Sequence, residues 1–175
     1  MNIQEIIREH IEEENFDLKY KIGDKLERIQ FNMTPTIAYD YLLIDVNNKY
    51  SFLHPDLNKC QCEDLPEKSD YAIYFEKISS FCKRTFDEIL NQSDYKEHIH
   101  EVKINPTVRD LLKQIFKKQI TSIDLPTIWQ FALYTNKKNE RAPRILFFIG
   151  HWGIIYILAF DQWHQTSLMQ DNIKK

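Results

Sequence analysis

Five residues near the C-terminus have side chains suited to acid–base chemistry on a phosphate ester. Arg144 and His164 stand at the two ends of a long apolar stretch, and Lys137, Lys138 and Arg141 precede it. Cationic groups bind phosphate, while an imidazole accepts and donates protons near neutral pH. Together these types suffice for metal-free RNA cleavage. The simpler interpretation is a basic loop that aids solubility, with a histidine at a strand end, and position by position it is the commoner one.

Three short runs rich in β-branched and aromatic residues must position these groups. They span residues 128–135, 144–150 and 154–161, and turn-forming residues separate them, which predicts three consecutive antiparallel strands. The last two runs are almost continuously apolar, so we expect both of their faces to be buried. In such a meander the start of the second strand lies beside the end of the third. We therefore expect Arg144 and His164 at one end of the sheet, bordered by the basic loop.

Two amphipathic helices are predicted before these strands. Apolar residues recur at helical spacing over residues 71–82, with Ser69 or Asp70 as the N-cap, and again over residues 106–118, where Asn105 precedes a proline. Thr85 to Glu88 matches a capping box and predicts a further short helix. Two apolar runs on either side of Asn47-Asn48 predict a β-hairpin over residues 39–53.

These elements predict a single α+β domain. Its core is a twisted antiparallel sheet with a C-terminal three-stranded meander, covered on one face by the two amphipathic helices. We expect residues 1–48 to form an N-terminal extension, with a helix over residues 3–11 followed by strands, packed on the core or extending the sheet. Residues 49–165 form the α+β core, and residues 166–175 a frayed tail.

Other candidate ligands have simple alternative explanations. His98 and His100 share one face of a strand, which suits a metal or a general base, but their charged neighbours favour a solvated loop. Cys60-x-Cys62 lacks the spacing of the common zinc motif. Cys62 and Cys82 are expected to be small buried apolar residues, and a zinc protein is the weakest of the functional alternatives. We predict neither a metal nor a small-molecule cofactor.

Composition narrows the class of protein. The chain has 43% apolar residues, enough to bury a core, and its net charge is −3. Acidic residues predominate in residues 1–100 and basic ones in residues 101–150. The sequence has no apolar run of membrane-spanning length, no signal-peptide pattern, and an odd number of cysteines, so we expect a cytoplasmic protein. It also has no glycine-rich phosphate loop, Gly-x-Ser-x-Gly elbow or His-Glu-x-x-His motif, which excludes several large enzyme classes.

The order of predicted elements resembles the RelE/HigB-type toxin superfamily. A strand at residues 49–53, helices near 70–90 and 106–118, and then three antiparallel strands follow that family's order, and the run from Arg144 to Leu158 resembles its hairpin core. The resemblance implies a small bacterial toxin that cuts messenger RNA, usually on the ribosome, without a metal, and that an antitoxin holds inactive. This chain departs from the family in its net negative charge, in its extra residues 1–48, and in lacking basic residues after the last strand.

The first functional hypothesis is therefore a toxin-like protein that acts on RNA or the ribosome. In it, Arg144 binds phosphate, His164 does acid–base work, and Lys137, Lys138 and Arg141 bind the substrate strand. The second is a non-catalytic interaction module, such as an immunity, antitoxin-like or phage-defence component, whose acidic N-terminal part meets a basic partner.

Overall fold

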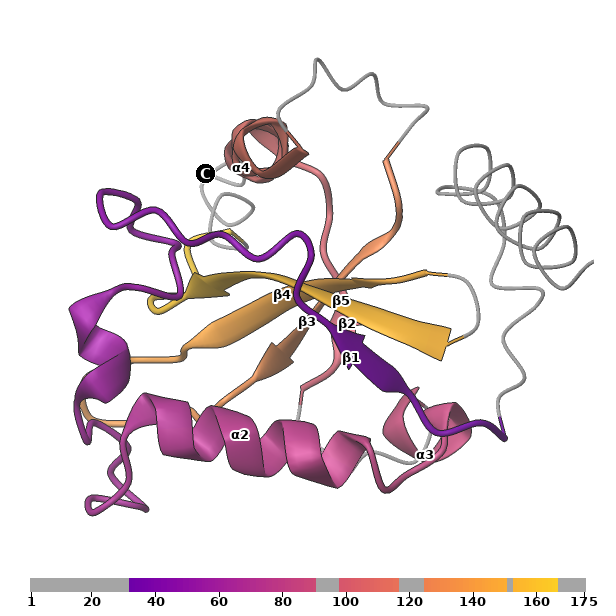
Figure 1. Ribbon diagram of the computed structural model, residues 1–175. Helices are drawn as coiled ribbons and strands as arrows, with labels where there is room; N and C mark the ends of the chain where they lie inside the picture. The colour runs from indigo at the N-terminus through magenta and orange to yellow at the C-terminus, as the bar shows by residue number, and fades with distance from the viewer. Residues whose placement is uncertain (1–31, 91–97, 117–124, 151–152, 167–175) are drawn as a thin grey trace, which may run out of the picture.

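The computed structural model describes residues 32–90, 98–116, 125–150 and 153–166 (Figure 1). Its elements, in chain order, are β1 (Thr36–Ala38), η2 (Pro55–Asn58), α2 (Asp70–Phe81), α3 (Phe86–Leu90), β2 (His100–Glu101), α4 (Pro106–Phe116), β3 (Ile128–Ala132), β4 (Arg144–Ile149) and β5 (Ile154–Asp161). The α+β class predicted from the sequence is confirmed. The helix and first strand expected within residues 1–31 lie outside the described residues, as does most of the expected tail.

A five-stranded mixed sheet forms the centre of the molecule, in the order β1-β5-β4-β3-β2. β3, β4 and β5 are consecutive antiparallel neighbours, and β2 pairs antiparallel with β3. β1 runs parallel to β5 at the opposite edge. The prediction of a wholly antiparallel sheet was therefore wrong at this edge, where part of the expected N-terminal extension joins the sheet.

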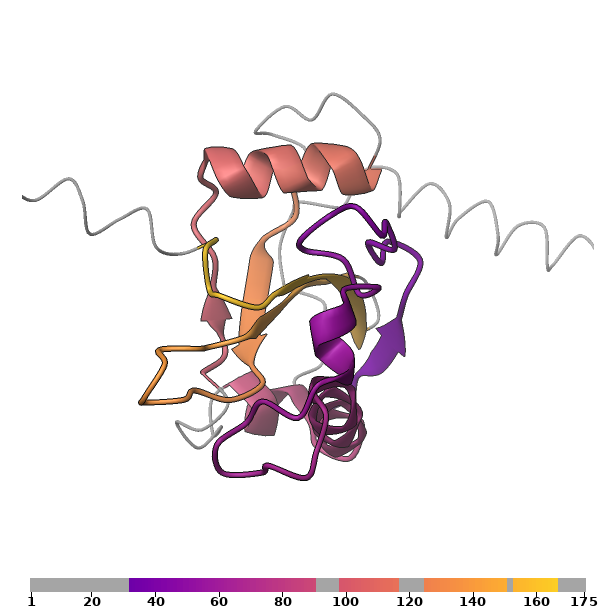
Figure 2. The same cartoon turned by 90° about the vertical axis from the view of Figure 1, so that its left-hand side faces the viewer.

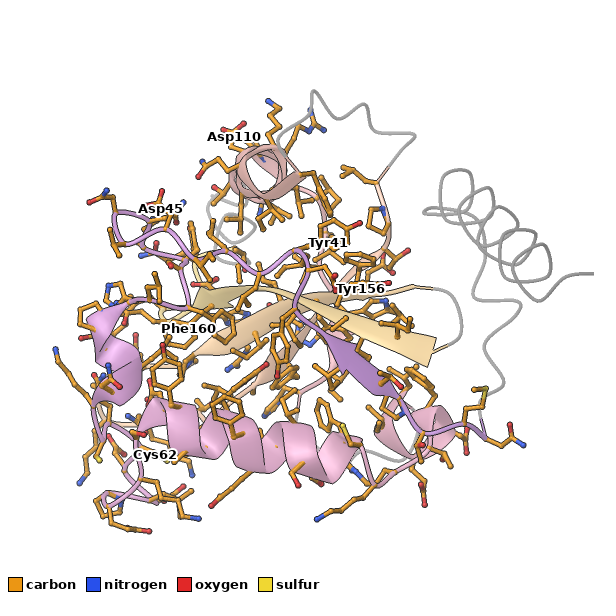
Figure 3. All side chains as sticks on the ribbon, in the orientation of Figure 1. Tyr41, Asp45, Cys62, Asp110, Tyr156 and Phe160 are labelled. Atoms are coloured by element: carbon orange, nitrogen blue, oxygen red, sulfur yellow. The ribbon has the colours of Figure 1, made fainter. Side chains whose placement is uncertain are left out.

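Helices cover both faces of this sheet (Figures 1 and 2). On one face, α2 and α3 contribute Ile73, Phe81 and Phe86 to a core that includes Phe160. On the other face, Leu112 and its neighbours in α4 cover a second core. Figure 3 shows Phe160 between the sheet and α2, with Tyr41 and Tyr156 on the α4 side. The prediction that both helices lie on one face was wrong, because β4 and β5 are apolar on both sides and each side needs its own cover.

The segment expected to be a hairpin, residues 39–53, contains turns instead of strands. The turn itself forms at the Asn-Asn pair, where Asn48 N donates to Asp45 O at 3.0 Å. Its two arms use backbone groups on the last strand: Leu43 N donates to Leu158 O, and Tyr50 O accepts from Phe160 N. A backbone bond from Phe52 N to Leu43 O at 2.9 Å joins the two arms, but with both arms also bonded to β5 they do not form the regular ladder of a hairpin. The domain boundary expected at residue 48 falls inside this segment.

Local capping starts the helices where the sequence predicts. Ser69 is the N-cap of α2, and its side chain accepts from Ala72 N. At α3, Thr85 N donates to Glu88 Oε2 at 2.7 Å and Glu88 N donates to Thr85 Oγ1 at 3.3 Å, which is the predicted capping box. At α4, Asn105 Oδ1 accepts from Val108 N at 2.9 Å. These caps fix where the sheet-covering helices begin.

Candidate functional site

The predicted neighbours Arg144 and His164 do lie at one end of the sheet. Arg144 opens β4 directly opposite Asp161, the last residue of β5. Arg144 is only 6% exposed, and its Nη1 donates to the carbonyl oxygens of Tyr134 and Pro143 at 3.3 and 3.2 Å. Nε is buried without a hydrogen-bond partner among the described residues. Arg144 is thus a fixed buried cation with donor capacity left over, on the α4 face of the sheet.

The turn that carries His164 is built around the carboxylate of Asp161. Its Oδ1 accepts from Gln165 N at 3.0 Å, and its Oδ2 accepts from Thr166 N and Thr166 Oγ1 at 2.7 and 2.8 Å. Thr166 is fully buried, and its carbonyl accepts from Asn105 at the start of α4. The expected fraying therefore does not begin at Thr166. Within the turn, His164 adopts a φ of 54°, a conformation that strains most non-glycine residues.

Gln130 of β3 connects this turn to β2. Its side-chain Nε2 lies 3.0 Å from Nε2 of His164 and 2.6 Å from Nε2 of His100. His100 is paired with Gln130 in the β2–β3 register, and its Nδ1 lies 3.1 Å from the carbonyl oxygen of His98. His98 and His100 are exposed, as expected, but they border the site instead of standing apart from it. Sequence reasoning missed Gln130 altogether.

Burial and nearby charge favour the neutral form of two histidines in this cluster, His164 and His98. Burial lowers the pKa of His164 below its ordinary 6.5, and Arg144 lowers it further, against the opposing effect of Asp161. Burial also lowers the pKa of His98, with Arg144 again the largest charge effect. Burial lowers the pKa of Arg144 itself. A fixed cation beside two neutral imidazoles is suited to bind an anion, and a bound anion would in turn favour imidazole protonation.

Arg141 is placed in the protein interior. It is 1% exposed, and Nη2 forms an ion pair with Asp70 Oδ2 at 2.8 Å, with Asp70 fully buried at the start of α2. Tyr134 donates to the other Asp70 oxygen and accepts from Arg141 Nε. The Trp163 ring stacks over the guanidinium with 5.2 Å from Cζ to the ring centroid. With its guanidinium buried and engaged in this way, Arg141 joins the β3–β4 loop to α2 and has little surface left for a substrate.

Lys137 and Lys138 are exposed at the tip of the same loop. Asn136 anchors the loop, because its side chain accepts from Glu63 N and donates to Gln61 O. The loop connects β3 to Arg144, so the two lysines stand at the same end of the sheet as the cluster. Their exposure allows them to meet a ligand in solvent.

The three cysteines are free thiols, with Cys62 buried in the α2-side core and Cys60 and Cys82 exposed. The expectation that Cys82 is buried was therefore wrong: it is exposed at the C-terminal end of α2, directly after Phe81. In the four described ranges, no three or more His, Cys, Asp or Glu side chains are arranged to hold a metal ion.

Comparisons with protein-family models, with curated proteins and with solved structures find no match to this chain. Among the described residues, none of the helices has the length and apolarity needed to cross a membrane.

Proposed function

We propose that this chain is a toxin-like, cytoplasmic RNA-acting protein whose site cleaves a phosphodiester without a metal. The observation that supports this most is the convergence of His98, His164 and Arg144 at one end of the sheet, where the charge of Arg144 acts on both imidazoles. The resemblance to RelE/HigB-type toxins motivates the choice of RNA, and of messenger RNA on the ribosome as the substrate. Lys137 and Lys138 steer the strand toward the site.

In the proposed reaction the positive charge of Arg144 holds the scissile phosphate at this end of the sheet. One imidazole removes the proton of the 2′-hydroxyl as the 2′-oxygen bonds to phosphorus. The bond from phosphorus to the 5′-oxygen breaks, and the second imidazole gives that oxygen a proton. The products are a 2′,3′-cyclic phosphate and a 5′-hydroxyl. His164 and His98 are assigned these two roles because each ring keeps a nitrogen free of the contacts that engage both nitrogens of His100.

The test incubates the full-length protein with ribosome-bound messenger RNA in the presence of a metal chelator, and maps the cleaved ends. We expect 2′,3′-cyclic phosphate ends, and a rate about 10²–10⁴-fold lower in His98→Asn and in His164→Asn. Arg144→Ala should abolish cleavage. Asparagine is chosen because it tolerates the positive φ of both histidines, 45° and 54°.

Glu140 offers a matched control, since it is exposed and has a φ of 54°. Glu140→Asn should leave the rate unchanged. Lys137→Gln and Lys138→Gln should lower the rate at low salt, whereas Lys113→Gln on α4 should not. Intact RNA after incubation with well-folded wild-type protein at high concentration would contradict the proposed RNA cleavage.

The second candidate function is a non-catalytic interaction module of the immunity, antitoxin-like or phage-defence kind. It is favoured by the turn segment 39–53, where Ile44, Val46 and Leu53 are 63%, 72% and 49% exposed. Asp45 lies at the tip of this segment, on the surface (Figure 3). Exposed apolar side chains next to a carboxylate suit a partner with an apolar surface bordered by basic residues.

The two functions respond to different substitutions. For an interaction module, Asp45→Lys and Val46→Lys should abolish a complex purified from a bacterial host, whereas His164→Asn should leave it intact. Size-exclusion chromatography of the purified complex gives the readout. A complex that survives both lysine substitutions excludes this segment as the binding surface.

A further inference from the structure

Gln130 shares one side-chain amide between two histidines. Its Nε2 lies 2.6 Å from His100 Nε2 and 3.0 Å from His164 Nε2. The residue is fully buried, and Oε1 has no hydrogen-bond partner among the described residues. The bonds that this amide makes within the described structure therefore go to the two imidazoles.

The contact of His100 Nδ1 determines which nitrogens of the two rings carry protons. Nδ1 of His100 faces the carbonyl oxygen of His98 at 3.1 Å, and because a carbonyl only accepts, Nδ1 carries a proton. In the neutral ring, Nε2 is then an acceptor and receives one of the two amide protons of Gln130. The other amide proton goes to His164, whose Nε2 must also be an acceptor. Neutral His164 is thereby held with its proton on Nδ1.

A half-turn of the amide reverses this arrangement. Oε1 would then face both rings, and because it only accepts, both rings would need a proton on Nε2. Nδ1 of His100 still carries the proton that it donates to the carbonyl oxygen of His98, so with both nitrogens protonated His100 is an imidazolium. His164 can remain neutral, with its proton on Nε2 and a lone pair on Nδ1. Protonation of His100 thus changes Nδ1 of His164 from a proton donor to a proton acceptor.

Charged groups from every neighbouring element bear on this equilibrium. Arg144 of β4 disfavours protonation of His164, and Asp161 at the end of β5 favours it. His98 and His100 add a smaller repulsion, and Lys77 of α2 acts on His98. An anion beside Arg144 would offset the effect of the Arg144 charge on His164 and His98.

We propose that Gln130 is a positioning residue whose amide orientation transmits the protonation of His100 to the tautomer of His164. Its catalytic consequence rests on the proposed function, because it decides whether Nδ1 of His164 acts as base or acid. The tautomer itself is a property of the free protein.

Imidazole ¹⁵N NMR of the full chain tests this without RNA. In wild-type protein at pH 8 we expect His164 to carry its proton on Nδ1. As His100 becomes protonated, the proton of His164 should move to Nε2, so the signals of its protonated and unprotonated nitrogens should interchange. In Gln130→Glu, a carboxylate accepts from both rings, so His164 should carry its proton on Nε2 throughout. Gln130→Met should uncouple the tautomer of His164 from His100.

Gln165→Glu is the matched control, since it places the same charge one residue from His164 on the exposed side of the turn. It should leave the tautomer as in wild type. Wild-type His164 protonated on Nε2 at pH 8 overturns the inference, and so does an unchanged interchange in Gln130→Met. The wild-type spectrum decides even where a variant fails to fold. If His164 carries its proton on Nδ1 as expected but RNA is not cleaved, only the proposed function is contradicted. If RNA is cleaved but His164 carries its proton on Nε2 at pH 8, only this inference is contradicted.

Discussion

His164 occupies a strained conformation at the end of a buried strand, and its environment opposes charge. It is half-buried with a φ of 54°, its ring is hydrogen-bonded to Gln130, and Arg144 stands nearby. A side chain kept in such a conformation by surrounding contacts is a common feature of functional sites. The lowered pKa also links the histidine to the stability of the protein.

The pH dependence of unfolding measures this link. Unfolded His164 gains its proton near pH 6.5, whereas the folded residue resists protonation until lower pH. Between these values the unfolded state binds more protons, so the free energy of unfolding falls as pH drops below 6.5 and is fully retained above it. Urea unfolding at pH 7.5 and pH 5.5 should therefore show a smaller loss in His164→Asn than in wild type. Equal losses would contradict the lowered pKa.

Arg141 shows how a residue that the sequence suggests is a ligand becomes part of the interior. Its partner Asp70 is fully buried, and burial raises the pKa of that carboxyl against the opposing hydrogen bonds from Tyr134 and Arg141. Removing one member of a buried pair leaves the other charge uncompensated.

A double-mutant cycle tests this pair. Arg141→Met should cost about 3–5 kcal/mol of unfolding free energy, because Asp70 loses its counterion. The double variant Asp70→Asn/Arg141→Met should lose less than the two single variants together, by about 0.5–3 kcal/mol. Urea unfolding at pH 7 gives all four values. Strict additivity would show that the two side chains do not interact.

At the scale of elements, the connection between β4 and β5 depends on close contact with α3. Gly153 has a φ of 72°, and a Cβ built there would lie 2.7 Å from Cε2 of Phe86, which is fully buried. Neither the backbone conformation nor the packing leaves room for a side chain. Glycine is therefore required at this position for two separate reasons.

Gly153→Ala should lower the unfolding free energy by at least about 1–3 kcal/mol, the usual range for overpacking a core. Gly150→Ala is the comparison. Its Cβ would also lie 2.7 Å from a ring atom, but that ring belongs to Tyr156, which is partly exposed, and Gly150 does not have a positive φ. Thermal unfolding followed by circular dichroism should show the larger loss in Gly153→Ala. The reverse order would contradict the packing described here.

At the scale of the whole molecule, two cores share one sheet. β4 contributes Ile145 and Phe147 to the α2-side core and Leu146 and Phe148 to the α4-side core. Because both cores pack against the same strands, neither core can unfold without exposing one face of the sheet to water. The described part of the chain should therefore unfold as one cooperative unit.

Matched leucine truncations on the two faces test this. Leu57 is fully buried in the α2-side core, and Leu112 is 1% exposed in the α4-side core. Leu57→Ala and Leu112→Ala should each cost about 2–5 kcal/mol. In each variant the midpoint of unfolding should shift by the same amount whether unfolding is followed by far-ultraviolet circular dichroism or by tryptophan fluorescence. Two separate transitions in either variant would show that the cores unfold independently.

Much of the fold follows from local patterns that the sequence displays directly. The apolar runs of β4 and β5 determine that these strands are central and buried on both faces, because no other place in a small domain hides so much apolar surface. Ser69, Thr85 and Asn105 start their helices through hydrogen bonds that span only three residues. The neighbouring positions of Arg144 and Asp161 follow from antiparallel pairing alone.

The site required tertiary structure, because its contacts join residues far apart in the chain. Gln130 meets His100 and His164 across separations of 30 and 34 residues, and Arg141 meets Asp70 across 71. Periodicity reports which face of an element is apolar, but it carries no information about which polar side chains from separate elements meet. Likewise, the chain displays two amphipathic helices, and only the packed sheet decides that they cover opposite faces.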